Sequence, residues 1–145
     1  MAFSADGKLK KVSVSGGAPL TLCDARNSRG GTWTPDGAII FAPDFSSGLW
    51  RVRAAGGVSE ELTKPDKEKK EGSHRWPHVL PDGKHIIFTA QHLGKDFNSA
   101  DIEIVSLETG ERKVIHRGGA YGRYLPTGHL VFAREATLFA APFDL

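Results

Sequence analysis

The chain has 145 residues, with 19 Lys and Arg against 17 Asp and Glu, so its formal net charge at pH 7 is +2. Its composition, 39% hydrophobic and 25% charged residues, excludes an intrinsically disordered protein, and no apolar run is long enough to span a bilayer. The small net charge gives no indication of a nucleic-acid partner, and the single Cys23 excludes an internal disulfide.

Turn-forming residues set the pattern of the predicted elements, because 17 Gly and 8 Pro spread along the chain favour many short strands. The first two strands are predicted at residues 9–17, which end in Gly-Gly, and at residues 20–23. Residues 31–42 read Gly-Thr-Trp-Thr-Pro-Asp-Gly-Ala-Ile-Ile-Phe-Ala, which predicts two antiparallel strands joined by a Pro-Asp-Gly turn. Residues 49–57 repeat the alternation and the Gly-Gly ending of residues 9–17, and residues 58–63 follow as the next strand.

The same succession of strands returns twice along the rest of the chain. It is preceded by residues 64–75, whose charges of both signs predict a solvated loop. A Pro-Asp/Thr-Gly turn followed by an apolar-apolar-Phe strand recurs within residues 74–89 and within residues 121–132. The strands that match residues 9–17 and 20–23 recur at residues 102–110, 112–116 and 138–143.

Successive Pro-Asp/Thr-Gly turns are separated by 46 and 45 residues, and each full unit holds four short strands. A repeat of this length and strand content is typical of one blade of a β-propeller. We therefore predict an all-β fold, a partial β-propeller of about three to four four-stranded antiparallel blades. The single propeller domain, residues 1–145, is expected to divide into a partial blade 1–27, blades 28–70 and 71–116, and a partial blade 117–145.

These motifs resemble the WD40-like propeller repeat of the TolB type. The resemblance rests on Trp33-Thr-Pro-Asp-Gly-Ala-Ile-Ile-Phe41, followed by the strand Leu49-Trp-Arg-Val52 and a Gly-Gly turn. Residues 9–17, 72–76 and 118–128 are most similar to propellers attached to bacterial serine/threonine kinase domains. The resemblance implies a non-enzymatic sensor, scaffold or binding module for protein or small-molecule ligands, with no cofactor. It also allows an extracytoplasmic location, although the sequence itself leaves the compartment unknown.

Two alternative functions remain open from the sequence. The chain could be the propeller part of a prolyl-oligopeptidase-like hydrolase, gating substrate to a separate catalytic domain, or a TolB-like periplasmic scaffold. The Gly-x-Ser-x-Gly signature of a hydrolase nucleophile does not occur in the chain, and neither do the kinase motifs. We therefore predict no catalytic residue.

No metal site is expected from the sequence. His74 and His78 share one face of a predicted strand, but a straight strand places them about 13 Å apart, too far to bind one ion. His85 lies across the predicted hairpin and is placed to approach one of them. The carboxylates that precede turn glycines are accounted for by hydrogen bonds within the turns; these are Asp6, Asp36 and Asp82.

The candidate ligand site lies on the predicted innermost strands, because these line the central channel of a propeller. Arginines near each of them would give one channel mouth a positive charge suited to a carboxylate, a phosphate or an acidic peptide. The alternative is that they pair with the backbone or carboxylates of neighbouring blades. The candidate residues are Arg29, His74, Arg75, Trp76, Arg117, Tyr121 and Arg123.

The length of the chain is itself informative, because closed propellers typically have about 4–8 blades. We expect a protein partner or a small anionic ligand, together with a way of covering the open ends. Either two copies form a twofold homodimer that completes a six-bladed ring, or the chain is a fragment of a longer propeller.

Overall fold

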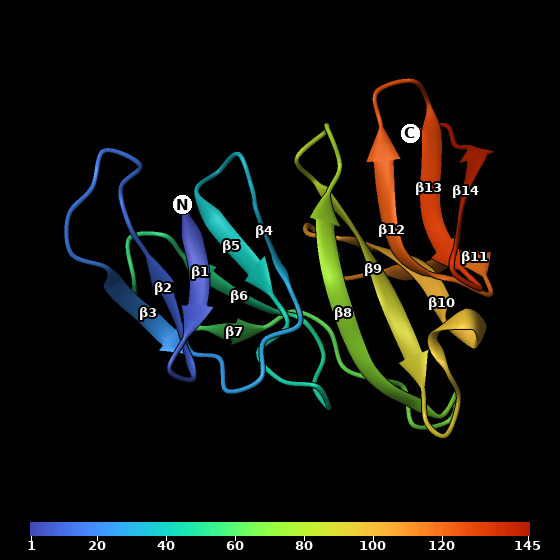
Figure 1. Cartoon of the computed structure of the whole chain (residues 1–145), viewed down its shortest axis with the longest axis horizontal. Helices are drawn as coiled ribbons and strands as arrows, with labels where there is room; N and C mark the ends of the chain where they lie inside the picture. The colour runs from blue at the N-terminus through green and yellow to red at the C-terminus, as the bar shows by residue number, and fades with distance from the viewer.

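The computed structural model describes residues 1–145 and contains strands β1 to β14 in four antiparallel sheets. Figure 1 shows the sheets side by side in chain order, with the N-terminal sheet at the left and the C-terminal sheet at the right. The predicted all-β fold with sheets of three or four strands is confirmed. The one helical segment, η1 (Phe97–Ser99), is a single 3-10 turn, and no helix is long and apolar enough to cross a membrane.

Each sheet is built from strands that follow one another in the chain. The first sheet contains β1 (Ala2–Ala5), β2 (Lys8–Lys11) and β3 (Leu20–Asp24). The second contains β4 (Gly31–Trp33), β5 (Ala38–Phe41), β6 (Trp50–Arg53) and β7 (Glu60–Glu61). The third contains β8 (Glu71–Val79), β9 (His85–His92), β10 (Asp101–Ser106) and β11 (Arg112–Arg117). The fourth contains β12 (Ala120–Leu125), β13 (His129–Arg134) and β14 (Thr137–Pro142).

The first sheet has one strand more than the sequence analysis expected. Asp6 and Gly7 both have positive φ, 54° and 69°, so they form a two-residue hairpin turn that pairs β1 with β2. The first sheet therefore has three strands, whereas the repeats predict only its two outer strands.

Three apolar clusters hold neighbouring sheets together. The cluster between the second and third sheets includes Ile40 and Leu49 on one side and Ile86 and Phe88 on the other, all fully buried. Similar clusters join the first sheet to the second and the third to the fourth. All four residues of β5 are buried, which explains its continuous apolar sequence.

The first and fourth sheets have three strands each, one fewer than the second and third sheets. The inner edge of β1 is open because the first sheet begins at that strand, and the outer edge of β14 is open because the fourth sheet ends there. Leu138 and Phe139 on β14 are 73% and 44% exposed. Unpaired edges of this kind are where another chain can add a strand.

Candidate functional site

The first strands of the second, third and fourth sheets, β4, β8 and β12, form the inner face of the molecule. β8 packs against β4 on one side and against β12 on the other. The residue five places before the turn proline of each sheet has positive φ: Gly30 at 97°, Trp76 at 52° and Tyr121 at 61°. Bulky side chains rarely adopt this conformation, so the backbone is strained at Trp76 and Tyr121.

A β-bulge accompanies each of these two strained residues. The pairing register shifts between Arg75 and His78 in β8 and between Ala120 and Arg123 in β12. Bulges redirect side chains locally and are common beside functional sites.

Side chains from these two strands and from η1 gather into one group, which we call the inner-face cluster: Arg75, Trp76, Phe97, Tyr121 and Arg123. The Trp76 ring centroid lies 5.0 Å from that of Phe97 and 5.7 Å from that of Tyr121. The guanidinium of Arg75 lies 5.0 Å from the Phe97 ring centroid, and that of Arg123 lies 3.9 Å from the Tyr121 ring centroid. Each end of the aromatic row therefore carries an arginine in cation–π contact.

The two arginines hydrogen-bond to backbone and hydroxyl oxygens and form no ion pair. Arg123 Nη1 donates to the carbonyl oxygens of Trp76 and Gly122, at 3.1 and 2.8 Å. Arg75 donates from Nε to Ser73 Oγ at 2.8 Å and from Nη2 to the carbonyl oxygen of Phe45 at 3.0 Å. The sequence analysis left open that these arginines pair with the backbone or carboxylates of neighbouring blades. The backbone part of that alternative is present, since both arginines hydrogen-bond to the backbone of a neighbouring sheet. A guanidinium has five N–H groups, however, so donors remain on both.

Positive charge accumulates around the cluster. Burial lowers the pKa of Arg75, and the nearby charge of Arg29 lowers it further. Burial also lowers the pKa of His78, with a further contribution from the charge of Arg123. No salt bridge joins Arg29, Arg75 or Arg123 to a carboxylate. The inner face therefore holds three guanidinium groups whose charge is not neutralised by an ion pair.

The structure brings most, but not all, of the predicted site residues together. Arg75, Trp76, Tyr121 and Arg123 belong to the cluster, and Arg29 adjoins it because its carbonyl oxygen accepts the Trp76 N–H at 2.8 Å. Arg117 does not lie on the inner face, contrary to the prediction. It ends the outer strand β11, its side chain is 77% exposed, and it pairs with Asp101 at 3.2 Å.

Two further residues differ from the prediction: His74 lies away from the inner-face cluster, and Phe97 belongs to the cluster although the sequence did not predict it. His74 is fully buried. Phe97 is in η1, whose N-cap Asp96 accepts the Ser99 N–H. The Asp96-x-x-Ser99 spacing could have indicated this turn, but nothing in the sequence shows that it folds toward β8.

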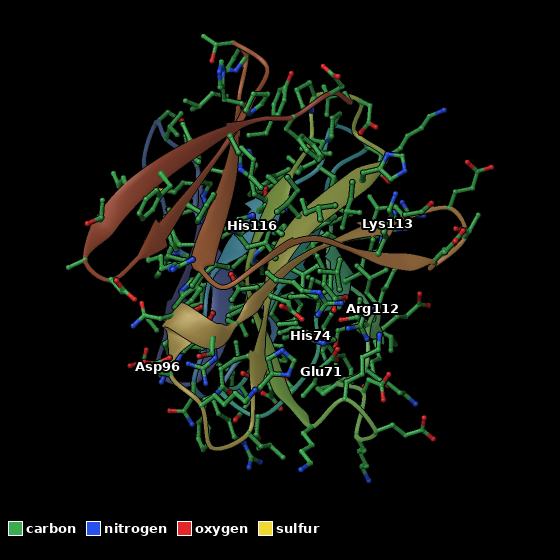
Figure 2. All side chains as sticks on the ribbon, turned by 90° about the vertical axis from the view of Figure 1, so that its right-hand side faces the viewer. Glu71, His74, Asp96, Arg112, Lys113 and His116 are labelled. Carbon is green, nitrogen blue, oxygen red and sulfur yellow. The ribbon has the colours of Figure 1, made fainter.

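A second polar group, which we call the buried network, contains His74 and links the second and third sheets. Its other members are Thr63, Glu71, Glu103 and Arg112. Thr63 Oγ1 lies 2.6 Å from His74 Nδ1, and His74 Nε2 lies 2.9 Å from Glu71 Oε2. Arg112 Nη2 donates to both carboxylate oxygens of Glu71 at 2.9 and 2.8 Å, and its Nε donates to Glu103 at 2.9 Å. Figure 2 shows Glu71, His74 and Arg112 grouped together in the interior.

Electrostatics fix the proton positions in the buried network. Burial opposes ionisation of Glu71, but hydrogen bonds from His74, the Asp66 N–H and Arg112 outweigh it and lower its pKa to about 2. Burial lowers the pKa of His74, so the ring is neutral at pH 7. An ionised Glu71 can only accept hydrogen bonds, so His74 Nε2–H donates to it and Nδ1 accepts the hydroxyl of Thr63.

This sequence of hydroxyl, imidazole and carboxylate is the order of a hydrolase relay, but the surroundings do not suit catalysis. Thr63, Glu71 and His74 are 4%, 3% and 0% exposed, so a substrate has no access to them. The Thr63 oxygen also accepts the Leu49 N–H at 2.9 Å, and Arg112 Nη1 donates to the carbonyl oxygen of Lys64 at 2.7 Å. These contacts make the network a structural link between two sheets.

His85 and His92 each lie beside a single carboxylate, and the His92 Nε2 atom is 3.2 Å from Asp101 Oδ2. His85 Nδ1 lies 2.6 Å from Asp82, whose carboxylate also accepts the backbone N–H groups of Lys84 and His85. No group of three or more His, Cys, Asp or Glu side chains is arranged to hold a metal ion.

Comparisons with known proteins bear on the fold. No protein-family model matches the chain, and no curated protein matches its sequence. A solved structure described as a putative TolB from Agrobacterium tumefaciens superposes with a TM-score of 0.76 at 17% identity, over 97% of this chain and 53% of that one. TolB from Acinetobacter baumannii gives a TM-score of 0.72 at 22% identity, over 94% of this chain and 35% of that one.

An enzyme shares the same architecture. An oligogalacturonate lyase in complex with manganese superposes with a TM-score of 0.64 at 15% identity, over 88% of this chain and 36% of that one. The chain thus spans about half of one TolB structure and about a third of the other two proteins. The chain has the fold of a partial β-propeller similar to TolB, as predicted from its repeats. The expected likeness to kinase-attached propellers stays a prediction.

Proposed function

We propose that the chain is a non-enzymatic propeller module that binds an anionic group of a protein partner or small ligand at the inner-face cluster. The observation that carries this proposal is the gathering of Arg29, Arg75 and Arg123, without ion pairs, beside strained aromatic residues. Arginines whose charge is not neutralised within the protein favour a carboxylate or phosphate from outside. An open depression of about 640 Å³ is lined not by the cluster residues but, among others, by residues that follow them in β8 and β12, such as His78 and Tyr124.

Strain at the aromatic residues supports a binding role for this face. Trp76 and Tyr121 each adopt a conformation that costs on the order of 1–3 kcal/mol for a non-glycine residue. The equivalent residue in the second sheet is Gly30, which adopts it without strain. The Tyr121 residue is 48% exposed and Trp76 is partly buried, so the two rings present flat apolar surface next to positive charge, which suits an acidic peptide.

The same fold serves a lyase as well as TolB proteins, so a non-enzymatic role is argued from the site. The one relay-like group, Thr63, His74 and Glu71, is buried and already fully hydrogen-bonded. Attachment to a kinase, gating of a separate hydrolase domain and a periplasmic scaffold role all remain compatible with an anion-binding inner face.

The test is to titrate the protein with a tetraglutamate peptide and with pyrophosphate, and to measure the binding affinity by calorimetry at low and at high salt. We expect binding that weakens as salt rises, and a loss of about tenfold or more in affinity for Arg75→Gln and for Arg123→Gln. The control is Arg53→Gln, which removes the same charge from an exposed position on β6. Equal affinity in all three variants would assign the arginines to structure alone. Hydrolytic or lyase turnover by the isolated chain would overturn the non-enzymatic role.

A further inference from the structure

A small pocket lies between the first and second sheets and shares no residue with the inner-face cluster. Its volume is about 310 Å³, which is enough to hold a small molecule. Its walls come from the end of β3, the end of β5, the start of β6 and the loops beside them. None of its residues belongs to the first or the last strand of the chain.

Backbone hydrogen bonds fix the two loops that frame the pocket. The Asn27 N–H donates to the carbonyl oxygen of Pro43 at 3.1 Å, and the Arg29 N–H donates to that of Ala42 at 2.9 Å. The loop that follows β3 is therefore tied to the loop that follows β5. Binding sites for small molecules are usually formed in advance in this way, so a ligand need not order the loops.

The apolar wall of the pocket continues the core between the first two sheets. Phe41 is 1% exposed and belongs to the apolar cluster that joins these sheets, and Trp50 packs against the same cluster. Side chains alternate along β6, so Trp50 shares the face of the buried Val52, whereas Arg53 lies on the opposite face. Trp50 is only partly buried, so part of its indole ring is available to a ligand.

Two opposite charges line this pocket without an ion-pair partner. Arg26 and Asp44 form no salt bridge, either with each other or with another residue. Asp44 Oδ1 accepts the N–H and the hydroxyl of Ser46, both at 3.2 Å, and Oδ2 accepts no hydrogen bond. The third charged residue of the pocket, Asp24, is already paired with Lys8. One guanidinium and one carboxylate are therefore left for a ligand, beside an apolar wall.

We propose that this pocket binds a free α-amino acid with an aromatic or apolar side chain. Arg26 binds the carboxylate of the ligand, Asp44 binds its ammonium group, and its side chain lies against Trp50 and Phe41. A zwitterion pairs with both charges at once, whereas a simple anion or cation leaves one of them without a partner. A neutral sugar could hydrogen-bond to both groups but would neutralise neither charge.

The test compares three ligands of nearly the same shape by calorimetry. They are L-phenylalanine, phenethylamine, which lacks the carboxylate, and 3-phenylpropionate, which lacks the ammonium group. We expect one L-phenylalanine to bind per chain, and each of the other two to bind about tenfold more weakly.

Two variants assign the charges to the two ends of the ligand. Arg26→Gln should weaken the binding of L-phenylalanine about tenfold and leave the affinity for phenethylamine unchanged. Asp44→Asn keeps the oxygen that accepts from Ser46, and it should weaken L-phenylalanine but not 3-phenylpropionate. The controls are Arg53→Gln and Glu60→Gln, which remove the same charges from exposed positions on β6 and β7 and should leave all three affinities unchanged.

Thermal midpoints establish that all four variants are folded. The absence of L-phenylalanine binding at millimolar concentration would overturn the proposal, and so would an affinity that neither Arg26→Gln nor Asp44→Asn changes. Glucose or phenethylamine that binds as tightly as L-phenylalanine would identify a neutral sugar or a simple cation as the occupant, and would also overturn it.

Discussion

At the residue scale, Glu71 carries the most consequential contacts of the buried network. Its carboxylate accepts hydrogen bonds from His74, from the Asp66 N–H and from Arg112, all within the interior. Replacing it would leave the Arg112 guanidinium without its main partner, although Glu103 remains bonded to Arg112. We expect Glu71→Gln to lower the free energy of unfolding by about 3–5 kcal/mol, as for other broken buried pairs.

The same residue predicts how stability depends on pH. The pKa of Glu71 is lowered from 4.5 to about 2 in the folded protein, so its stabilisation is complete above about pH 4.5 and is lost as the pH falls toward 2. The pKa of His74 is also lowered, so the unfolded chain takes up a proton first as the pH falls below 6.5, and this destabilises the fold in the same direction. Burial raises the pKa of Glu103, which acts in the opposite sense.

Denaturant unfolding at pH 7, 5 and 3 measures this dependence. We expect the free energy of unfolding of the unchanged protein to decrease as the pH is lowered from 7 to 3. Between pH 5 and 3 the decrease should be smaller in Glu71→Gln. Glu68→Gln, on the exposed loop nearby, is the control and should keep the original slope. An unchanged slope in Glu71→Gln would show that other carboxylates govern acid unfolding.

At the scale of the element, the β13–β14 hairpin uses alanine where the β1–β2 hairpin uses glycine. Ala136 has a φ of 57°, and the equivalent Gly7 has a φ of 69°. Glycine adopts positive φ without steric cost, so Ala136→Gly should raise the free energy of unfolding by about 0.5–1 kcal/mol. Ala5→Gly, at the end of β1, should lower it by a similar amount, because glycine loses more backbone freedom on folding than alanine. A loss of stability in Ala136→Gly, measured by urea unfolding, would contradict this account.

The strands and turns also show which parts of the fold and of the candidate site could be predicted from the sequence. The Pro-Asp/Thr-Gly turns and the apolar-apolar-Phe strands repeat with one period, so they predicted the sheets and the inner strands that carry Arg75 and Arg123. β1 was missed because Phe3-Ser-Ala is too short to show alternation, although the Asp6-Gly7 pair marked a hairpin. Phe97 was missed for a different reason: its place beside Trp76 depends on the path of a loop, which no periodicity records.

At the scale of the whole molecule, the two open edges do not match each other. The first sheet has its second to fourth strands, and the fourth sheet has its first to third. Two copies that shared a sheet would bring six strands to a place where complete sheets have four. The twofold, six-bladed dimer expected from the sequence therefore requires two strands to be displaced at each junction, and it stays a prediction.

Exposed edges of this kind predict self-association that grows with concentration. β14 presents Leu138, 73% exposed, on an unpaired edge, so chains should associate there by adding strands. We expect the light-scattering mass to rise above one protomer with concentration, and Leu138→Lys to suppress the rise because a charge on an edge opposes pairing. Val58→Lys is the control, since Val58 is 88% exposed but lies outside the strands, in the loop before β7. A mass of two protomers that is independent of concentration and unaffected by Leu138→Lys would favour the closed dimer, because a ring leaves no edge for further chains to join.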